Sequence, residues 1–172
     1  MGSQVLKASA RRWTAVLALL LTGVLSACGV SSDRDRAVAS ANAAIIDVDR
    51  AGSDIAEAIA ALSVEDGKKR DLADVREAGE TYLAATESLN GAIRKMGETN
   101  GQLQSYVQDN FLSASERAVS DCQRALELLR DDAISDQDLR SAITLLGRCI
   151  DRYASAVDGV SKEYAKISDP DE

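Results

Sequence analysis

The stretch LRSAITLLGRCIDRYASAVDGVSKEYAKI, residues 139–167, decides the fold of this chain. Its apolar positions recur at alternating steps of three and four residues, a spacing that places them on one stripe of an α-helix. A half-buried strand would need strict alternation instead. The positions of the stripe are Leu139, Ile143, Leu146, Ile150, Tyr153, Val157, Val160, Tyr164 and Ile167.

Three earlier segments repeat this spacing, with charged and polar residues on the opposite face. Their stripes run through Val38, Ala41, Ile45, Val48, Gly52, Ile55, Ile59 and Leu62; through Leu72, Val75, Gly79, Tyr82, Thr86, Leu89, Ile93 and Met96; and through Leu103, Val107, Phe111, Ala114, Ala118, Cys122, Ala125 and Leu129. Each stripe needs an apolar partner, so the sequence predicts an all-α fold.

Capping signals set the expected ends of the helices. A hydroxyl followed three residues later by an acid or amide is typical of a helix start, and Gly97 is expected to close the second helix in a left-handed cap. The expected helices cover 33–62, 66–96, 100–130 and 136–167, which favours an antiparallel up-down-up-down four-helix bundle. An elongated pair of helical hairpins is the alternative. The four capping pairs are Ser32 with Asp35, Ser63 with Asp66, Thr99 with Gln102, and Ser135 with Asp138.

The first 28 residues have the organisation of a secretion signal. Lys7, Arg11 and Arg12 are basic, and no acidic residue stands among them. An apolar run of 13 residues follows, from Trp13 to Leu25. A run of that length suits the apolar region of a signal peptide and is shorter than the roughly 20 residues that cross a bilayer.

The residues Leu25-Ser26-Ala27-Cys28 directly after this run resemble the lipobox of bacterial lipoproteins. The resemblance covers only this N-terminal segment. It implies a signal peptide over 1–27, cleavage before Cys28, and acylation of Cys28 with fatty acid such as palmitate. It further implies a short lipidated tether over 28–32, the bundle over 33–167 and an acidic tail over 168–172. The other interpretations are a soluble-secretion signal with a chance cysteine, or a short buried strand or helix.

The same resemblance bears on localisation. It implies a cell-envelope protein held by its lipid on the extracytoplasmic side of a bacterial membrane. Gly29, standing where some lipoproteins have Asp, permits transfer to an outer membrane if the cell has one.

Cys122 and Cys149 are candidates for a structural disulfide. Both lie equally far from the turn expected around residues 134–136, and residues equidistant from the turn of an antiparallel hairpin face each other. The expected envelope compartment is oxidising enough to keep the bond. Two free thiols packed as small apolar residues are the alternative, and the lack of a Cys-x-x-Cys pair argues against a redox-active site.

Charge and composition exclude several function classes. The formal net charge is −8, and loss of the three basic signal residues makes the mature chain more acidic still. Such a surface repels nucleic acid, so we expect no nucleic-acid partner, and the lipid on Cys28 must supply the membrane attachment. With no histidine in the chain, Ser-His-Asp catalysis and the common zinc and di-iron sites are excluded.

No cofactor, metal site or enzymatic activity is expected. The acid-rich stretch at Asp131, Asp132, Asp136 and Asp138 lacks the glycine and glutamate of an EF-hand loop, so a solvated turn with acids at a helix start is the better interpretation.

Three function classes remain. The first is a non-enzymatic envelope lipoprotein that binds or scaffolds a partner protein. The second is a small-ligand domain resembling the four-helix extracytoplasmic domains of bacterial sensors, which a cavity beside Tyr82 and Tyr153 would favour. An enzyme with an unrecognised carboxylate or serine site is third. The distal end of the bundle, with Lys68, Lys69 and Arg70 beside the acidic turn, is the expected contact surface.

Overall fold

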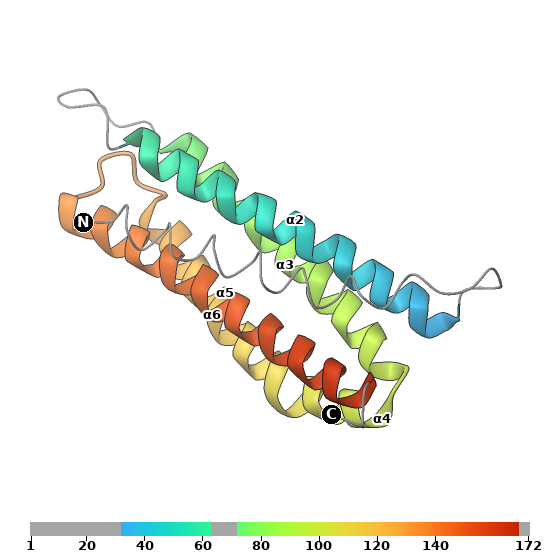
Figure 1. Cartoon of the computed structure of the whole chain (residues 1–172). Coiled ribbons are helices and arrows are strands. Elements are labelled where there is room, and N and C mark those ends of the chain that lie inside the picture. Colours follow the sequence, from blue (N-terminus) through green and yellow to red (C-terminus); the bar gives the residue numbers. More distant parts are fainter. Residues whose placement is uncertain (1–31, 63–71, 169–172) are drawn as a thin grey trace.

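The computed structural model describes residues 32–62 and 72–168 of the 172-residue chain (Figure 1). All regular structure in these two ranges is helical, so the prediction of an all-α fold is confirmed. The predicted signal peptide, Cys28, the Ser63 cap and the acidic tail beyond residue 168 lie outside them. The elements are α2 (Asp33–Leu62), α3 (Ala73–Glu98), α4 (Gly101–Tyr106), the π-helical turn η2 (Val107–Phe111), α5 (Leu112–Leu128) and α6 (Asp136–Ser168).

The helices pack as two pairs that lie against each other. Helix α2 lies along α3, α5 lies along α6, and α3 joins the pairs through α4 and α5 (Figure 1). At one end, the Arg34 guanidinium donates to Ser168 Oγ at 2.8 Å and lies 5.3 Å from the centre of the Tyr164 ring. At the other end, Arg76 of α3 forms an ion pair with Asp132 between α5 and α6. The start of α2 therefore lies beside the end of α6.

Two of the predicted helix starts have the expected capping geometry. Asp35 N–H donates to Ser32 Oγ and Ser32 N–H donates to the Asp35 carboxylate, both at 3.1 Å. Asp138 N–H donates to Ser135 Oγ at 3.1 Å. Side-chain oxygens thus satisfy N–H groups that have no partner within the helix.

The predicted boundary between the second and third helices was wrong in detail. Asn100, not Thr99, is the N-cap, and its side chain accepts from the N–H groups of Gln102 and Leu103. Thr99 ends α3 instead, with its hydroxyl donating to the carbonyl of Met96 at 2.7 Å. Gly97 lies within α3 and does not form a left-handed cap. It is buried because α4 and η2 approach closely, and a Cβ there would lie 3.4 Å from Gln104 Cα.

Three aromatic rings occupy the centre of the core. Tyr82 and Tyr153 have ring centroids 6.4 Å apart with an interplanar angle of 75°, and Phe111 meets Tyr153 at 6.4 Å and 68°. All three side chains are buried. Edge-to-face pairs of this kind contribute roughly 0.5–1.5 kcal/mol each beyond their burial. The cluster therefore ties α3, η2 and α6 together.

The two buried tyrosine hydroxyls differ in their partners. Tyr153 Oη donates to the Thr86 carbonyl at 2.9 Å and lies 2.9 Å from Oδ1 of Asn90. Tyr82 Oη has no hydrogen-bond partner among the described residues. Burial raises the pKa of both phenols, and for Tyr82 the neighbouring Tyr153, Asp151 and Asp49 raise the pKa further. Both therefore remain protonated, and only Tyr153 uses its hydroxyl to join two helices.

Cys122 of α5 and Cys149 of α6 form a disulfide, with Cα atoms 5.5 Å apart. The pairing agrees with the prediction from their equal distance to the turn. Both residues are fully buried. The bond closes a loop across a sequence separation of 27 and fixes the register of α5 against α6.

The two tyrosines provide a matched pair for testing the core. Tyr153→Phe is expected to lower the free energy of unfolding by about 1–2 kcal/mol, because it leaves the groups around Thr86 and Asn90 without their partner. Tyr82→Phe is expected to leave stability unchanged or raise it slightly, because its hydroxyl is buried without a partner. Urea unfolding of the purified proteins measures both. Equal losses from both substitutions would contradict this assignment.

The disulfide gives a second prediction. Replacing both Cys122 and Cys149 with alanine is expected to cost roughly 3–4 kcal/mol, because the unfolded chain regains the freedom that a loop of this size restricts. Thermal unfolding with and without reductant measures the effect. Reductant should lower the unfolding temperature of the wild type and leave that of the double variant unchanged. An equal response of both proteins would show that the bond does not contribute.

Candidate functional site

The π turn η2 interrupts the helix that runs from Gly101 to Leu128. The Leu112 N–H donates to the Val107 carbonyl, five residues earlier, where an α-helix would bond four residues back. Buried side chains occur at Leu103, Val107, Phe111 and Ser115, three consecutive steps of four. An α-helix has 3.6 residues per turn, so such a run drifts off one face unless a wider turn takes up the excess.

The π turn moves Ala114 out of the core. The predicted core stripe included Ala114, but Ser115 is the buried residue, with its hydroxyl donating to the Leu112 carbonyl at 2.9 Å. Ala114 is only half-buried and lines a groove between α5 and α6. The prediction for Ala114 was wrong because a regular step of three was assumed where the helix widens.

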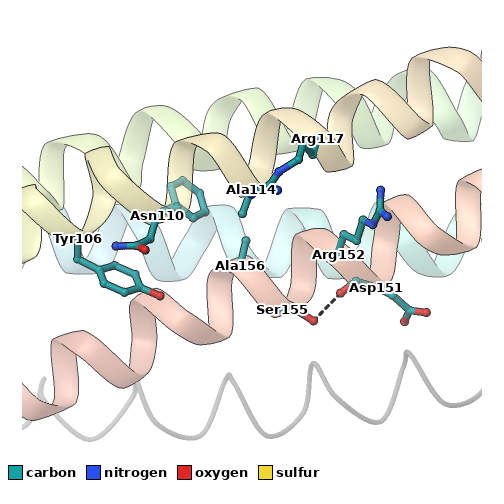
Figure 2. Close-up of a pocket in the computed structure, with 9 residues that line it drawn as sticks. Tyr106, Asn110, Ala114, Arg117, Asp151, Arg152, Ser155 and Ala156 are labelled. Atoms are coloured by element: carbon teal, nitrogen blue, oxygen red, sulfur yellow. Dashed lines mark hydrogen bonds between the residues drawn. The ribbon is translucent and has the colours of Figure 1, made fainter.

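The groove has a volume of about 510 Å³ and an amphipathic lining. Figure 2 shows α5 and α6 on its two sides, with Ala114 and Ala156 facing each other between them. Phe111, which also contacts Tyr153, is buried directly beneath this apolar floor. The remaining lining residues are Tyr106, Asn110, Arg117, Asp151, Arg152 and Ser155.

Two arginines lie at one end of the groove, one from each helix (Figure 2). Arg152 forms an ion pair at 2.6 Å with Asp121, a carboxylate whose side chain is only 11 % exposed. Arg117 donates through Nε to the Ser113 carbonyl at 3.1 Å, and no carboxylate of the described residues forms an ion pair with it. The Asp151 carboxylate points away from α5 (Figure 2). Guanidinium groups therefore dominate this end.

A phenol and an amide lie at the opposite end. Tyr106 extends from the last residue of α4 to α6, where its hydroxyl lies over Gly159 so closely that a Cβ on Gly159 would overlap it. Asn110 of η2 lies beside Tyr106 and is exposed (Figure 2). The glycine thus makes room for the tyrosine, and this end offers hydrogen-bonding groups without charge.

The polar groups of the groove include one serine, Ser155, and a phenol, Tyr106. Ser155, its only hydroxyl besides Tyr106, donates to the Asp151 carbonyl at 2.8 Å within α6, and no general base contacts it. Activation of a serine needs a base in hydrogen-bond reach. Within 32–62 and 72–168, no three His, Cys, Asp or Glu side chains gather to hold a metal. Two guanidiniums, a phenol and an amide surround the apolar floor of the groove.

The predicted site residues lie elsewhere in the molecule. Cys122 and Cys149 form the buried disulfide, and Cys28 lies outside the described residues. Tyr82 and Tyr153 are fully buried and do not line the groove. The cavity considered beside them is therefore not the recess that the structure shows.

The acid-rich turn also has a structural explanation. Asp131 accepts from the Ala133 N–H at 2.8 Å, Asp132 pairs with Arg76, and Asp138 caps α6 with Ser135. These carboxylates stabilise the turn and the helix start. Lys68, Lys69 and Arg70 lie outside the described residues.

Sequence reasoning missed the residues of the groove. The sequence signal for the groove was the run of four-residue steps from Leu103 to Phe111. This run predicts a local widening of the helix, but it does not predict which side chains line the groove.

No known protein family, no curated protein and no solved structure matches this chain. None of the helices in the described parts of the chain combines the length and apolarity needed to cross a bilayer.

Deleting Asp109 tests the register explanation of the groove. Asp109 is exposed and does not line the groove. Its deletion would shorten the step from Val107 to Phe111 to three residues, and steps of four, three and four stay on one face of an α-helix. We expect a continuous α-helix, an unfolding temperature unchanged or higher, and a groove that keeps Tyr106 and Ala114 facing α6, because the π turn only takes up the residue that the deletion removes. Backbone NMR chemical shifts and thermal unfolding check both points. A large loss of stability would show that the core itself requires the π turn.

Proposed function

We propose that this protein is a lipid-anchored, non-enzymatic lipoprotein of the bacterial cell envelope, and that its helical domain binds a partner protein through the groove between α5 and α6. The lipobox at residues 25–28 supports the anchor. The groove supports the binding role, because it is an open recess with an amphipathic lining.

The contacts at the ends of the helices support an up-down-up-down arrangement of the proposed bundle. Arg34 near the start of α2 bonds to Ser168 at the end of α6, and Arg76 near the start of α3 pairs with Asp132 before α6. In such a bundle, the start of α2, the α3–α4 turn and the end of α6 share one end. Cys28 and Ser32 are four residue steps apart, which span at most roughly 14 Å, so that end would face the membrane closely.

This geometry gives the groove an orientation. Tyr106 and Gly159 lie toward the end of the molecule where α4 begins and α6 finishes, and the two arginines lie further along the helices. A partner in the groove would therefore lie along the bundle, with the arginines away from the bilayer. The groove is thus a second proposed contact surface besides the distal tip that was expected from the charges of residues 68–70.

A small-ligand binding domain is the second candidate. The groove volume of about 510 Å³ falls in the usual range of small-molecule sites, roughly 300–1,000 Å³. Such sites bury most of their ligand, however, and this groove is partly open.

The anchor is tested by intact mass of the protein from membranes of the native host. Wild type is expected to begin at Cys28 and carry acyl chains, and Cys28→Ala is expected to lose them and leave the membrane fraction. An unacylated wild-type chain of full length would remove the basis for an envelope lipoprotein.

The binding role is tested in the same cells with a photoreactive residue at Asn110, at the rim of the groove. A matched control places it at Ala43, an exposed position of α2. We expect a discrete protein adduct from position 110 only. Equal labelling from both positions, or none from either, would contradict specific binding at the groove.

A further inference from the structure

The arginine end of the groove and its apolar floor lie about one helical turn apart. Ala114 and Arg117 of α5 are separated by three residues, or about 4.5 Å along the axis. On α6, Arg152 and Ala156 are separated by four residues. Each helix therefore offers a small apolar position about one turn from an arginine, and Ala114 and Ala156 face each other across the groove (Figure 2).

We propose that the groove recognises a helical segment of the partner protein that carries an Asp or Glu one turn from an apolar side chain. This inference rests on the proposed protein-binding function and adds the chemistry of the partner. The carboxylate would pair with Arg117, and the apolar side chain would lie between Ala114 and Ala156, above the buried Phe111.

The charges of the groove favour a carboxylate. Arg152 already has Asp121 as its carboxylate partner. The Nε–H of Arg117 donates to the Ser113 carbonyl, and its terminal nitrogens can donate to another acceptor. Planar guanidinium groups bind carboxylates through two parallel hydrogen bonds, and such charged bonds are the strong ones. Asp151 does not compete, because its carboxylate points away from α5 (Figure 2).

The net charge of the chain limits the acidic element to a short motif. With a formal charge of −8, the protein repels a uniformly acidic partner. A single carboxylate placed at Arg117 is attracted locally and avoids most of that repulsion. The partner chemistry is therefore one acid in an otherwise apolar or neutral segment.

The shape of the groove favours a polypeptide helix. From Tyr106 to Arg117 the groove follows α4, η2 and α5 for about 16 Å, which is about three turns of a facing helix. Its floor carries small side chains, which let a third helix approach the seam between two others. Amphipathic helices bind in such grooves through anchors spaced three or four residues apart. Asn110 and Tyr106 can pair with polar groups at the far end of the segment.

The test uses two alanine-rich helical peptides of about 16 residues, long enough to form a helix in isolation. One carries Leu and Glu four residues apart, and the other has Gln in place of Glu. Titration of each into the full protein, followed by NMR chemical shifts, gives the affinity and the residues contacted. The protein variant is Arg117→Gln, and the matched control is Arg124→Gln, an exposed arginine on the same helix that does not line the groove.

We expect the Glu peptide to shift the signals of Asn110, Ala114 and Ser155 and to bind roughly tenfold more tightly than the Gln peptide. Arg117→Gln should remove this tenfold preference and leave the affinity for the Gln peptide unchanged. Arg124→Gln should change neither affinity. Only a direct pairing of Arg117 with the carboxylate predicts this combination.

Three outcomes would overturn the proposal. One is equal affinity for the two peptides. Another is binding of decanoate at the same residues with the same dependence on Arg117 while neither peptide binds, which would assign the groove to a small amphipathic carboxylate. The third is occupation by a second copy, seen as a dimer in sedimentation that Arg117→Gln dissociates. If the peptides fail and the adduct from position 110 persists in cells, the partner chemistry is wrong and the protein-binding function stands.

Discussion

The contact of Tyr153 with Phe111 and Tyr82 is the constraint on which the rest of the structure depends. Tyr153 reaches from α6 into the centre of the core, where its ring meets both other rings edge to face and its hydroxyl donates to the Thr86 carbonyl of α3. One side chain thus joins the two helix pairs by packing and by a hydrogen bond. Because a buried polar group without a partner is costly, this bond also selects how α6 is rotated against α3.

The groove is a consequence of that core. Phe111 must face Tyr153, while Leu103, Val107 and Ser115 must also point inward from the same helix. An α-helix cannot hold four residues per turn on one face over this distance, and the π turn supplies the extra residue. Its effect on the surface is that Ala114 leaves the core and that Tyr106 and Asn110 project beside α6. Packing inside the molecule therefore produces the recess outside it.

The α5–α6 pair, which carries the groove, is held together by a disulfide and an ion pair. The Cys122–Cys149 disulfide holds the two helices in register, and beside it Asp121, the residue before Cys122, pairs with Arg152, three residues after Cys149. A binding surface is more precise when its side chains stand on rigid elements, since less order has to be created on binding. In an anchored protein with a short tether, a rigid surface of this kind would present itself at a constant height above the membrane.

The sequence alone determined the features that depend on local spacing. Steps of three and four residues specify amphipathic helices whatever their partners are, Ser32 and Ser135 satisfy helix N–H groups a few residues away, and an antiparallel turn brings Cys122 opposite Cys149. Basic residues, an apolar run and a lipobox are likewise local patterns that predict export and acylation.

Only the tertiary structure decided the features that depend on which helix faces which. Gly97 looked like a helix end, but it is a contact point of α3 with α4 and η2. Thr99 was the predicted cap, but α4 begins at Gly101, so Asn100 is its N-cap. The groove joins Arg117 to Arg152, and Tyr106 to Gly159, across two helices. The periodicity within one helix does not predict which side chains of two helices come together. That depends on how each helix is rotated about its axis when it packs on the shared core.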